Sequence, residues 1–318
     1  MTDEFAGVLA RYPQPLRELN WVRLDVSGGL SGATIWRGEH GSVPLFGAKR
    51  YPAYCDSSHV VRGHRWIREA GRAGLAFVPN IVPNSDGTTV AEHRERVWEI
   101  QGWMPGEADF CAKPSRIKFD NACDGILRLV EVWRGLGTRI ETGRAVLSRL
   151  ELLGKWQSDP PTSSTPISIR ATAAIARYID RVKSRLLPWA DRPLPSQPCV
   201  RDLRADHFLF SGDKLTGLID FGAADWDTPA TDAARMLGEL AGDDPTLYGL
   251  GIERFSCGLG LEIDGPELIR ALDLAGTIGS VIHWMYRFQK PHLIPVSLRV
   301  AEARIVRLLR RLESDFFH

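Results

Sequence analysis

The stretch CVRDLRADHFLFSGDKLTGLIDFGAAD, residues 199–225, sets two carboxylates at the edges of short apolar runs. Asp202 follows the first run, and Asp220 comes eighteen positions later, after the last one. The pattern between them predicts two short strands, 207–210 and 215–219, paired as a hairpin. Because the open end of a hairpin brings its two flanks together, Asp202 and Asp220 are expected to converge.

Two neighbouring carboxylates repel each other unless a cation lies beside them. A magnesium-bound polyphosphate would supply that cation, because hard oxygen ligands suit Mg²⁺. A plainer interpretation is that Asp202 caps a turn and that Asp220 starts one before Gly222. Taken together, the pair and its flanking pattern favour the metal-nucleotide interpretation.

Composition limits the class of protein. The chain has 318 residues, of which 44% are hydrophobic and 25% charged, as in a globular protein with two lobes or domains. A net charge of +1 predicts no binding to nucleic acid or membranes. No apolar run reaches membrane-spanning length, and the five cysteines show no CxxC spacing, so neither a membrane span nor a disulfide or zinc framework is expected. Cytoplasm is the expected compartment.

Periodicity divides the chain at the segment MPGEAD, which begins at residue 104. Residues 1–103 predict a strand-rich lobe with one helix, and residues 104–318 a mainly helical lobe that contains the hairpin. Strands are expected at 20–26, within 27–39, at 43–52, 88–93 and 96–103, and the helix at 57–74. Helices of the second lobe are expected at 116–137, 143–157, 168–187, 230–241, 265–289 and 296–315, with proline-rich loops at 158–166 and 188–198.

Three motifs carry a family resemblance. VRDLRADH (200–207) is similar to the kinase catalytic loop H-R-D-L-x-x-x-N, and IDFG (219–222) to the metal-binding D-F-G. TDAARMLGEL (231–240) is similar to the Asp-containing helix that follows them. The chain thus resembles the protein-kinase-like fold, most closely small-molecule kinases of the aminoglycoside phosphotransferase type. The resemblance implies a bilobal α+β fold, with a small antiparallel-sheet N-lobe and a large, mainly helical C-lobe.

The resemblance implies roles for residues of the two loops. Asp202 would accept or orient the proton of the substrate hydroxyl, and Asp220 would hold Mg²⁺ against the nucleotide phosphates. Arg204 falls where a cation faces the transferred phosphoryl group. The alternative for Arg204 is a solvated loop arginine.

Upstream residues would complete the nucleotide site. Lys49, at the end of an apolar strand, fits the lysine that contacts the α- and β-phosphates, and Glu69, the only acid of helix 57–74, would orient it. The alternatives are a strand-end charge and a helix surface charge.

Two further segments would contact the nucleotide. In the turn SGGLSGAT, Ser31 and Gly32 would bring backbone N–H groups to the phosphates, unless the turn is a hairpin without a ligand. In EIQGWMPG, the backbone at Gln101 and Trp103 would read the base, although Trp103 also fits a core aromatic.

The catalytic loop departs from the family pattern at two positions. Val200 replaces a histidine that serves mainly in packing. His207 replaces the asparagine that supplies an oxygen to a metal, and imidazole nitrogen is a poorer ligand for Mg²⁺. His207 is a candidate metal ligand beside Asp220. Alternatively, His207 bonds Asp202 and fixes the loop while Asp206 supplies the oxygen.

Acids after the D-F-G segment bear on the acceptor. Asp225, Asp227, Glu239, Asp243 and Asp244 could form a face that attracts a polycationic aminosugar. The alternative is that they are helix caps and solvated acids.

The predicted function is Mg²⁺-dependent transfer of the γ-phosphate of ATP or GTP to a hydroxyl of a small molecule: an aminoglycoside-like compound, an amino alcohol or a sugar. The protein would act as a monomer or a homodimer. The alternatives are a nucleotide-binding pseudokinase, which the change at His207 motivates, and a protein kinase. The short segment after the D-F-G motif, with no A-P-E, disfavours the protein kinase.

Overall fold

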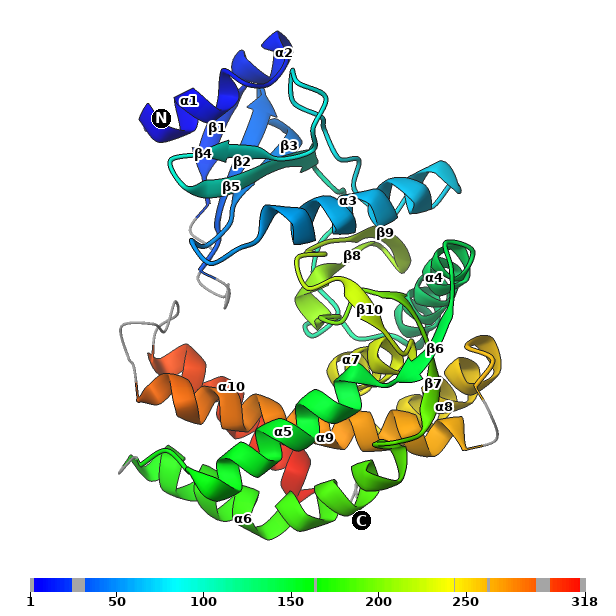
Figure 1. Cartoon of the computed structure of the whole chain (residues 1–318). Helices are drawn as coiled ribbons and strands as arrows, with labels where there is room; N and C mark the ends of the chain where they lie inside the picture. Colours follow the sequence, from blue (N-terminus) through cyan, green and yellow to red (C-terminus); the bar gives the residue numbers. More distant parts are fainter. Residues whose placement is uncertain are drawn as a thin grey trace.

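The chain folds into two lobes, one rich in strands and one rich in helices (Figure 1). The structure is a computed structural model, and it describes residues 3–24, 32–162, 165–242, 244–261, 264–289 and 298–314. No helix in these ranges is long and apolar enough to cross a membrane.

The upper lobe is built on a five-stranded antiparallel sheet with the strand order β1-β2-β3-β5-β4. Its strands are β1 (Asn20–Arg23), β2 (Thr34–His40), β3 (Val43–Arg50), β4 (Ala91–His93) and β5 (Arg96–Gly102). The turn between β4 and β5 has only two residues, Arg94 and Glu95, and both adopt positive φ. This is the backbone of a tight hairpin turn, made here without the usual glycine.

Helices flank the sheet. They are α1 (Asp3–Leu9), α2 (Gln14–Arg17) and α3 (Ser57–Arg72). The ring of Phe5 on α1 stacks on those of Trp36 and Trp98, with centroids 4.8 and 5.6 Å away, and forms a small core on one side of the sheet. Asp56 caps the N-terminus of α3, because its side chain accepts a hydrogen bond from the Ser58 N–H.

The lower lobe contains seven of the described α-helices, one three-stranded sheet and one two-stranded sheet. The helices are α4 (Arg116–Arg134), α5 (Arg144–Ser158), α6 (Pro166–Leu186), α7 (Ala230–Leu240), α8 (Pro245–Gly258), α9 (Gly265–Phe288) and α10 (Leu298–Glu313). The strands are β6 (Arg139–Thr142), β7 (Pro193–Cys199), β8 (Phe208–Ser211), β9 (Lys214–Leu218) and β10 (Asp225–Asp227). The predicted hairpin is β8–β9.

One large core fixes the position of α3 against the lower lobe. The apolar face of α3 packs with the helices below it, and the Trp133 indole of α4 donates a hydrogen bond to the Trp66 carbonyl at 2.9 Å. The sheet ends at Gly102, beside the predicted boundary, but α3 and residues 75–81 share the core of the lower lobe. The burial of each large apolar side chain in this core stabilises the fold by roughly 1.5–3 kcal/mol.

The prediction of a loop over 188–198 is wrong in its second half, where β7 forms. Pro195 lies opposite Ile140 and Pro198 opposite Trp226, in the middle of a three-stranded antiparallel sheet. Proline restricts φ to an extended value, so it fits a strand wherever its missing N–H is not required. The strand β7 ends at Cys199, directly before the 200–207 loop.

Candidate active site

An ion pair at the centre of the molecule joins the two lobes. Lys49 Nζ, on β3, lies 2.7 Å from Asp220 Oδ1, just beyond β9. Burial would lower the pKa of Lys49, but the carboxylates of Asp220 and Glu99 raise it above its usual value. The Lys49 ammonium holds the pKa of Asp220 far below its usual value, against the effect of burial. Both groups are therefore charged at neutral pH.

The backbone at Asp220 is strained. Its φ is 62°, in the left-handed region that residues with a side chain seldom adopt. A Cβ at Gly222 would lie 3.2 Å from Asp220 Oδ1 and 3.4 Å from Lys49 Nζ, so a glycine here permits the close approach of the ion pair. Strain of this kind is typical of residues that a fold holds for a ligand.

Glu99 is the second acid beside Lys49, and it is not among the residues predicted from the sequence. It faces Lys49 across the β3–β5 ladder and is 5% exposed. The Tyr51 hydroxyl donates to Glu99 Oε2 at 2.8 Å, and His64 Nε2 of α3 lies 2.6 Å from the same oxygen. Burial would raise the pKa of Glu99, but His64 and Lys49 lower it below its usual value. A buried carboxylate therefore supports the lysine from the sheet.

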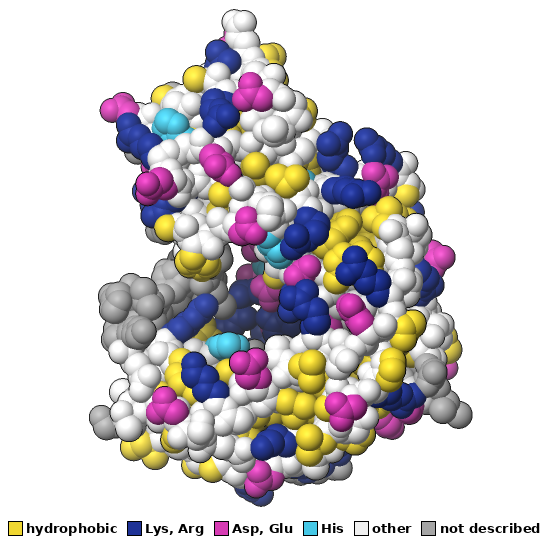
Figure 2. All heavy atoms as spheres, viewed as in Figure 1, with side chains coloured by type: hydrophobic (Ala, Val, Ile, Leu, Met, Phe, Trp, Pro, Cys, Tyr) yellow, Lys and Arg dark blue, Asp and Glu magenta, His cyan; other side chains and the backbone are white. Residues whose placement is uncertain are grey.

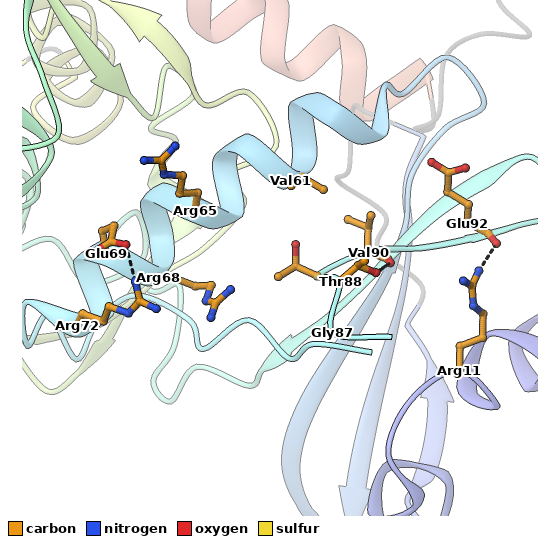
Figure 3. Close-up of a pocket in the computed structure, with 11 residues that line it drawn as sticks. Arg11, Val61, Arg65, Arg68, Glu69, Arg72, Gly87, Thr88, Val90 and Glu92 are labelled. Atoms are coloured by element: carbon orange, nitrogen blue, oxygen red, sulfur yellow. Dashed lines mark hydrogen bonds and ion pairs between the residues drawn. The ribbon is translucent and has the colours of Figure 1, made fainter. Parts of the chain in front are cut away.

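Glu69 does not orient Lys49, which corrects the prediction. Its carboxylate is bonded to Arg72 at 2.5 Å and lines a surface cavity among arginines of α3 (Figure 3). His64, five positions earlier, points to the sheet instead. At 100° per residue, five residues turn a side chain by about 140° around a helix, so the two residues cannot share one face. The polar contact from α3 to Glu99 of the sheet is made by the imidazole of His64.

Asp232, at the start of α7, fastens the 200–207 loop. Its two carboxylate oxygens accept backbone N–H groups of Val200 at 2.8 Å and of Arg201 at 2.6 Å. Burial raises the pKa of Asp232 to about 6, although both N–H groups oppose that rise. Arg201 has a φ of 67°, so the anchor stabilises a second strained residue, directly before Asp202.

Asp202 is held by an arginine that is not among the residues predicted from the sequence. Arg235 Nη2, on α7, donates to Asp202 Oδ1 at 3.0 Å. The same arginine reaches Glu239 Oε1 at 3.3 Å. No hydrogen bond from the described residues engages Asp202 Oδ2, so that oxygen can accept a proton from a substrate.

His207 contacts both loops. Its Nδ1 lies 2.8 Å from the Asp202 carbonyl, and its Nε2 lies 3.7 Å from Asp220 Oδ2. Because a carbonyl only accepts, Nδ1 carries a proton, and Nε2 faces Asp220. One nitrogen of His207 thus fixes the loop, and the other faces the carboxylate of Asp220.

Arg204 is held rigidly rather than solvated. Its Nε and Nη2 donate to the two oxygens of Asp206, both at 2.8 Å, and its side chain is 11% exposed. Burial opposes the charge of Arg204, but Asp206 raises its pKa above the usual value. The bidentate pair also occupies Asp206, which is therefore poorly placed to replace the missing asparagine oxygen.

A cleft of about 680 Å³ separates the lobes and brings most of the candidate residues together. Figure 2 shows its opening, with Lys and Arg side chains (dark blue) gathered inside. The predicted residues that line it are Lys49, Gln101, Trp103, Asp202, Arg204, His207 and Asp220. Glu69 does not line it, Gly32 adjoins its wall at Ala33, and Ser31 lies outside the described residues.

The end of β5 presents its backbone differently from the prediction. The Trp103 N–H donates to the Leu45 carbonyl at 2.9 Å, and Gln101 pairs with Gly47 in the ladder, so neither N–H is free for a base. Met104 also lines the cleft, and its N–H makes no hydrogen bond with the residues that the structure covers. The free donor is therefore shifted by one residue from the predicted position.

Asp220 and His207 are the residues that could hold a metal here. Lys49 pairs with Asp220 Oδ1, and Asp220 Oδ2 faces His207 Nε2. Within the described ranges, no group of three or more His, Cys, Asp or Glu side chains forms a metal site alone. Mg²⁺ is usually bound through one or two protein ligands together with phosphates and waters, so a carboxylate in this position fits it.

The acids after the D-F-G segment do not form an open acidic face. Asp225 accepts from Arg144 at 2.9 Å, and Asp227 is buried against backbone N–H groups. Glu239 faces Arg235, and Asp244 caps α8. Asp243 lies outside the described residues.

Comparisons with known proteins identify the family. The model of the phosphotransferase enzyme family matches residues 24–265. The chain belongs to this family. A search of curated proteins finds no match.

Solved structures with the same fold are aminoglycoside phosphotransferases and related small-molecule kinases. Spectinomycin phosphotransferase APH(9)-Ia, in complex with ADP and spectinomycin, has a TM-score of 0.70 and 10% identity over 98% of this chain and 97% of its own. Amicoumacin kinase hAmiN has a TM-score of 0.64 and 13% identity over 98% and 93%. A microcompartment-associated aminopropanol kinase has a TM-score of 0.64 and 16% identity over 97% and 94%. The bilobal kinase-like α+β fold is confirmed.

Proposed function

We propose that this phosphotransferase moves the γ-phosphoryl group of ATP or GTP to a hydroxyl of a small molecule, with Mg²⁺. The observation that carries the proposal is the Lys49–Asp220 ion pair at 2.7 Å, in a cleft that Asp202 also lines. Lys49 would bind the α- and β-phosphates, and the Asp220 carboxylate would hold the metal. Mg²⁺, when bound, would neutralise charge on the β- and γ-phosphate oxygens.

Asp202 would act on the acceptor. The hydroxyl oxygen would attack the γ-phosphorus, the bond from phosphorus to the β–γ bridging oxygen would break, and the proton would pass to Asp202. Arg235 holds one oxygen of Asp202 and leaves the other for this proton. Arg204, fixed by Asp206, would present positive charge to the transferred group.

The base would bind at the end of β5. Met104 lines the cleft, its N–H makes no hydrogen bond with the described residues, and a purine edge offers an acceptor for it. Such a contact would accept both ATP and GTP, which matches the two nucleotides that the proposal includes.

The experiment is an ADP- and GDP-release screen over aminoglycosides, amino alcohols, sugars and nucleosides. We expect turnover with at least one hydroxyl compound, loss of most of it in Asp202→Ala, and unchanged nucleotide affinity in that variant. The matched control is Asp213→Ala, at the exposed turn of the β8–β9 hairpin, which should turn over like the wild type. Full turnover by purified Asp202→Ala would overturn the assignment of the base, and nucleotide binding without turnover by any compound would favour a pseudokinase.

A further inference from the structure

A second cavity of about 400 Å³ adjoins the nucleotide cleft on the side of the lower lobe. The two share the side chains of Arg204, Asp206, Arg235, Trp284 and Arg304. Arg235 is bonded to Asp202, so the second cavity begins beside the proposed catalytic carboxylate. An acceptor with its hydroxyl at Asp202 would place the rest of its body there.

The walls of this cavity are unusually basic. Six arginines and three acids line it, so positive side chains exceed negative ones by three. The arginines are Arg149, Arg204, Arg235, Arg304, Arg307 and Arg311, and the acids are Asp206, Glu239 and Asp273. They come from α5, α7, α9, α10 and the 200–207 loop, so the fold gathers them from distant parts of the chain.

Two of the three acids each form an ion pair with one arginine. Asp206 is bound bidentately by Arg204, and Asp273 is bound by Arg311 in a buried pair. The third acid, Glu239, forms ion pairs with Arg235 at 3.3 Å and with Arg304 at 3.9 Å. One carboxylate thus faces two guanidinium groups.

Arg304 is only weakly compensated. Its ion pair with Glu239, at 3.9 Å, is the only one it makes with the described residues, and its side chain is 24% exposed. Burial, followed by the charge of Arg204, lowers the pKa of Arg304 to about 10. Burial also lowers the pKa of Arg149 to about 10, with Arg201 and Arg235 adding to the effect. Half-buried guanidinium groups that repel one another are stabilised by a bound anion.

We propose that the acceptor of this phosphotransferase carries an oxyanion group, a carboxylate or a phosphate, which Arg304 binds together with Arg235 at the mouth of the second cavity. The inference rests on the proposed function, since it assigns the acceptor of that same reaction. Guanidinium groups match both oxyanions through paired N–H donors. A polycationic aminosugar would meet like charge here and would be disfavoured.

The experiment uses one carbon skeleton in four charge states. Glycerate, glycerol 3-phosphate, glycerol and 3-amino-1,2-propanediol are titrated calorimetrically into the full chain with saturating ADP and Mg²⁺, which keep anions out of the nucleotide site. Gluconate, sorbitol 6-phosphate, sorbitol and glucamine repeat the series on a longer skeleton. The same compounds are then tested for ADP release with ATP.

We expect a carboxylate or phosphate compound to bind at least about tenfold more tightly than its uncharged match, and the cationic compound to bind least. Which of the two anionic compounds binds more tightly distinguishes the two oxyanions. Arg304→Gln should remove that preference, and Arg304→Lys should keep part of it. Arg310→Gln, at an exposed arginine on the same helix, is the matched control and should keep all of it.

The affinity for ADP distinguishes the possible failures. It should be unchanged in all three variants, which also shows that they fold. If ADP binds but the uncharged or cationic compounds bind as well as the anions, or if Arg304→Gln keeps the preference, the anionic acceptor is wrong and the kinase assignment stands. If the wild type binds no nucleotide, the proposed function itself is wrong.

Discussion

Lys49 on β3 and Asp220 beyond β9 are 171 residues apart in sequence, and their side chains meet at 2.7 Å. The pair joins the sheet of the upper lobe to the hairpin of the lower lobe. A buried ion pair contributes little to stability by itself, because desolvation offsets the attraction. Its position, in a cleft with Asp202, fits the proposed binding of a metal-bound polyphosphate.

Lys49→Met should lower kcat/KM by roughly a hundredfold, about 2.7 kcal/mol in the barrier, because the phosphates lose a fixed cation. Steady-state nucleotide turnover measures this loss. Lys214→Met, at the exposed first residue of β9, is the control and should behave as the wild type. Equal kinetics for the two variants would contradict the phosphate-binding role.

Glu99→Gln should lower the free energy of unfolding by about 1–3 kcal/mol, because His64 and Tyr51 lose the charged acceptor of two buried hydrogen bonds. Urea unfolding measures the change. Glu92→Gln, at an exposed acid of the neighbouring strand β4, should stay within about 0.5 kcal/mol of the wild type. A similar small effect at Glu99 would show that the acid does not support the site.

The pH dependence of stability should carry the signature of Asp232. Its folded pKa of about 6 lies above the ordinary value of 3.8, so the folded state holds its proton more tightly. The stability that this carboxyl contributes is therefore fully present below pH 3.8 and falls as the pH rises through about 6.

The check is the difference in unfolding free energy between the wild type and Asp232→Asn, measured by urea unfolding from pH 4 to pH 7. Other titrating groups cancel in this difference. It should shrink as the pH rises, and a difference that grows would mean that the Asp232 carboxylate is favoured by its two N–H bonds more than burial disfavours it.

His207→Asn should keep phosphotransfer within about tenfold, roughly 1.4 kcal/mol, because an amide can still take up a position beside Asp220. Its amide oxygen suits Mg²⁺ better than imidazole does, so the ratio of activity with Mn²⁺ to activity with Mg²⁺ should fall. Turnover with each metal alone gives this ratio. A loss of a thousandfold or more would show that His207 has a catalytic role of its own.

The motifs around Asp202 and Asp220 were sufficient to predict the bilobal fold, because they resemble the catalytic and metal-binding loops of the protein-kinase-like fold. The helices with clear apolar periodicity were also predicted within a few residues. The strand β7 was not, because its prolines indicate a loop unless the pairing partners Ile140 and Trp226 are known.

The site was predicted less completely than the fold, and the reason is geometric. Glu69 was chosen because it is the only acid on α3, but the helix turns it away and directs His64 to the sheet. Glu99 becomes a partner of Lys49 only once the register of β3 and β5 is fixed. The arginines of the second cavity are scattered over the sequence, and only the packing of α5, α7 and α10 against α9 gathers them.

The most direct test of this account is a crystal structure with Mg²⁺ and a non-hydrolysable ATP analogue. We predict a triphosphate beside Lys49, a metal on Asp220, and a γ-phosphorus that faces Asp202. A nucleotide bound at another surface, or a γ-phosphate directed away from Asp202, would contradict it.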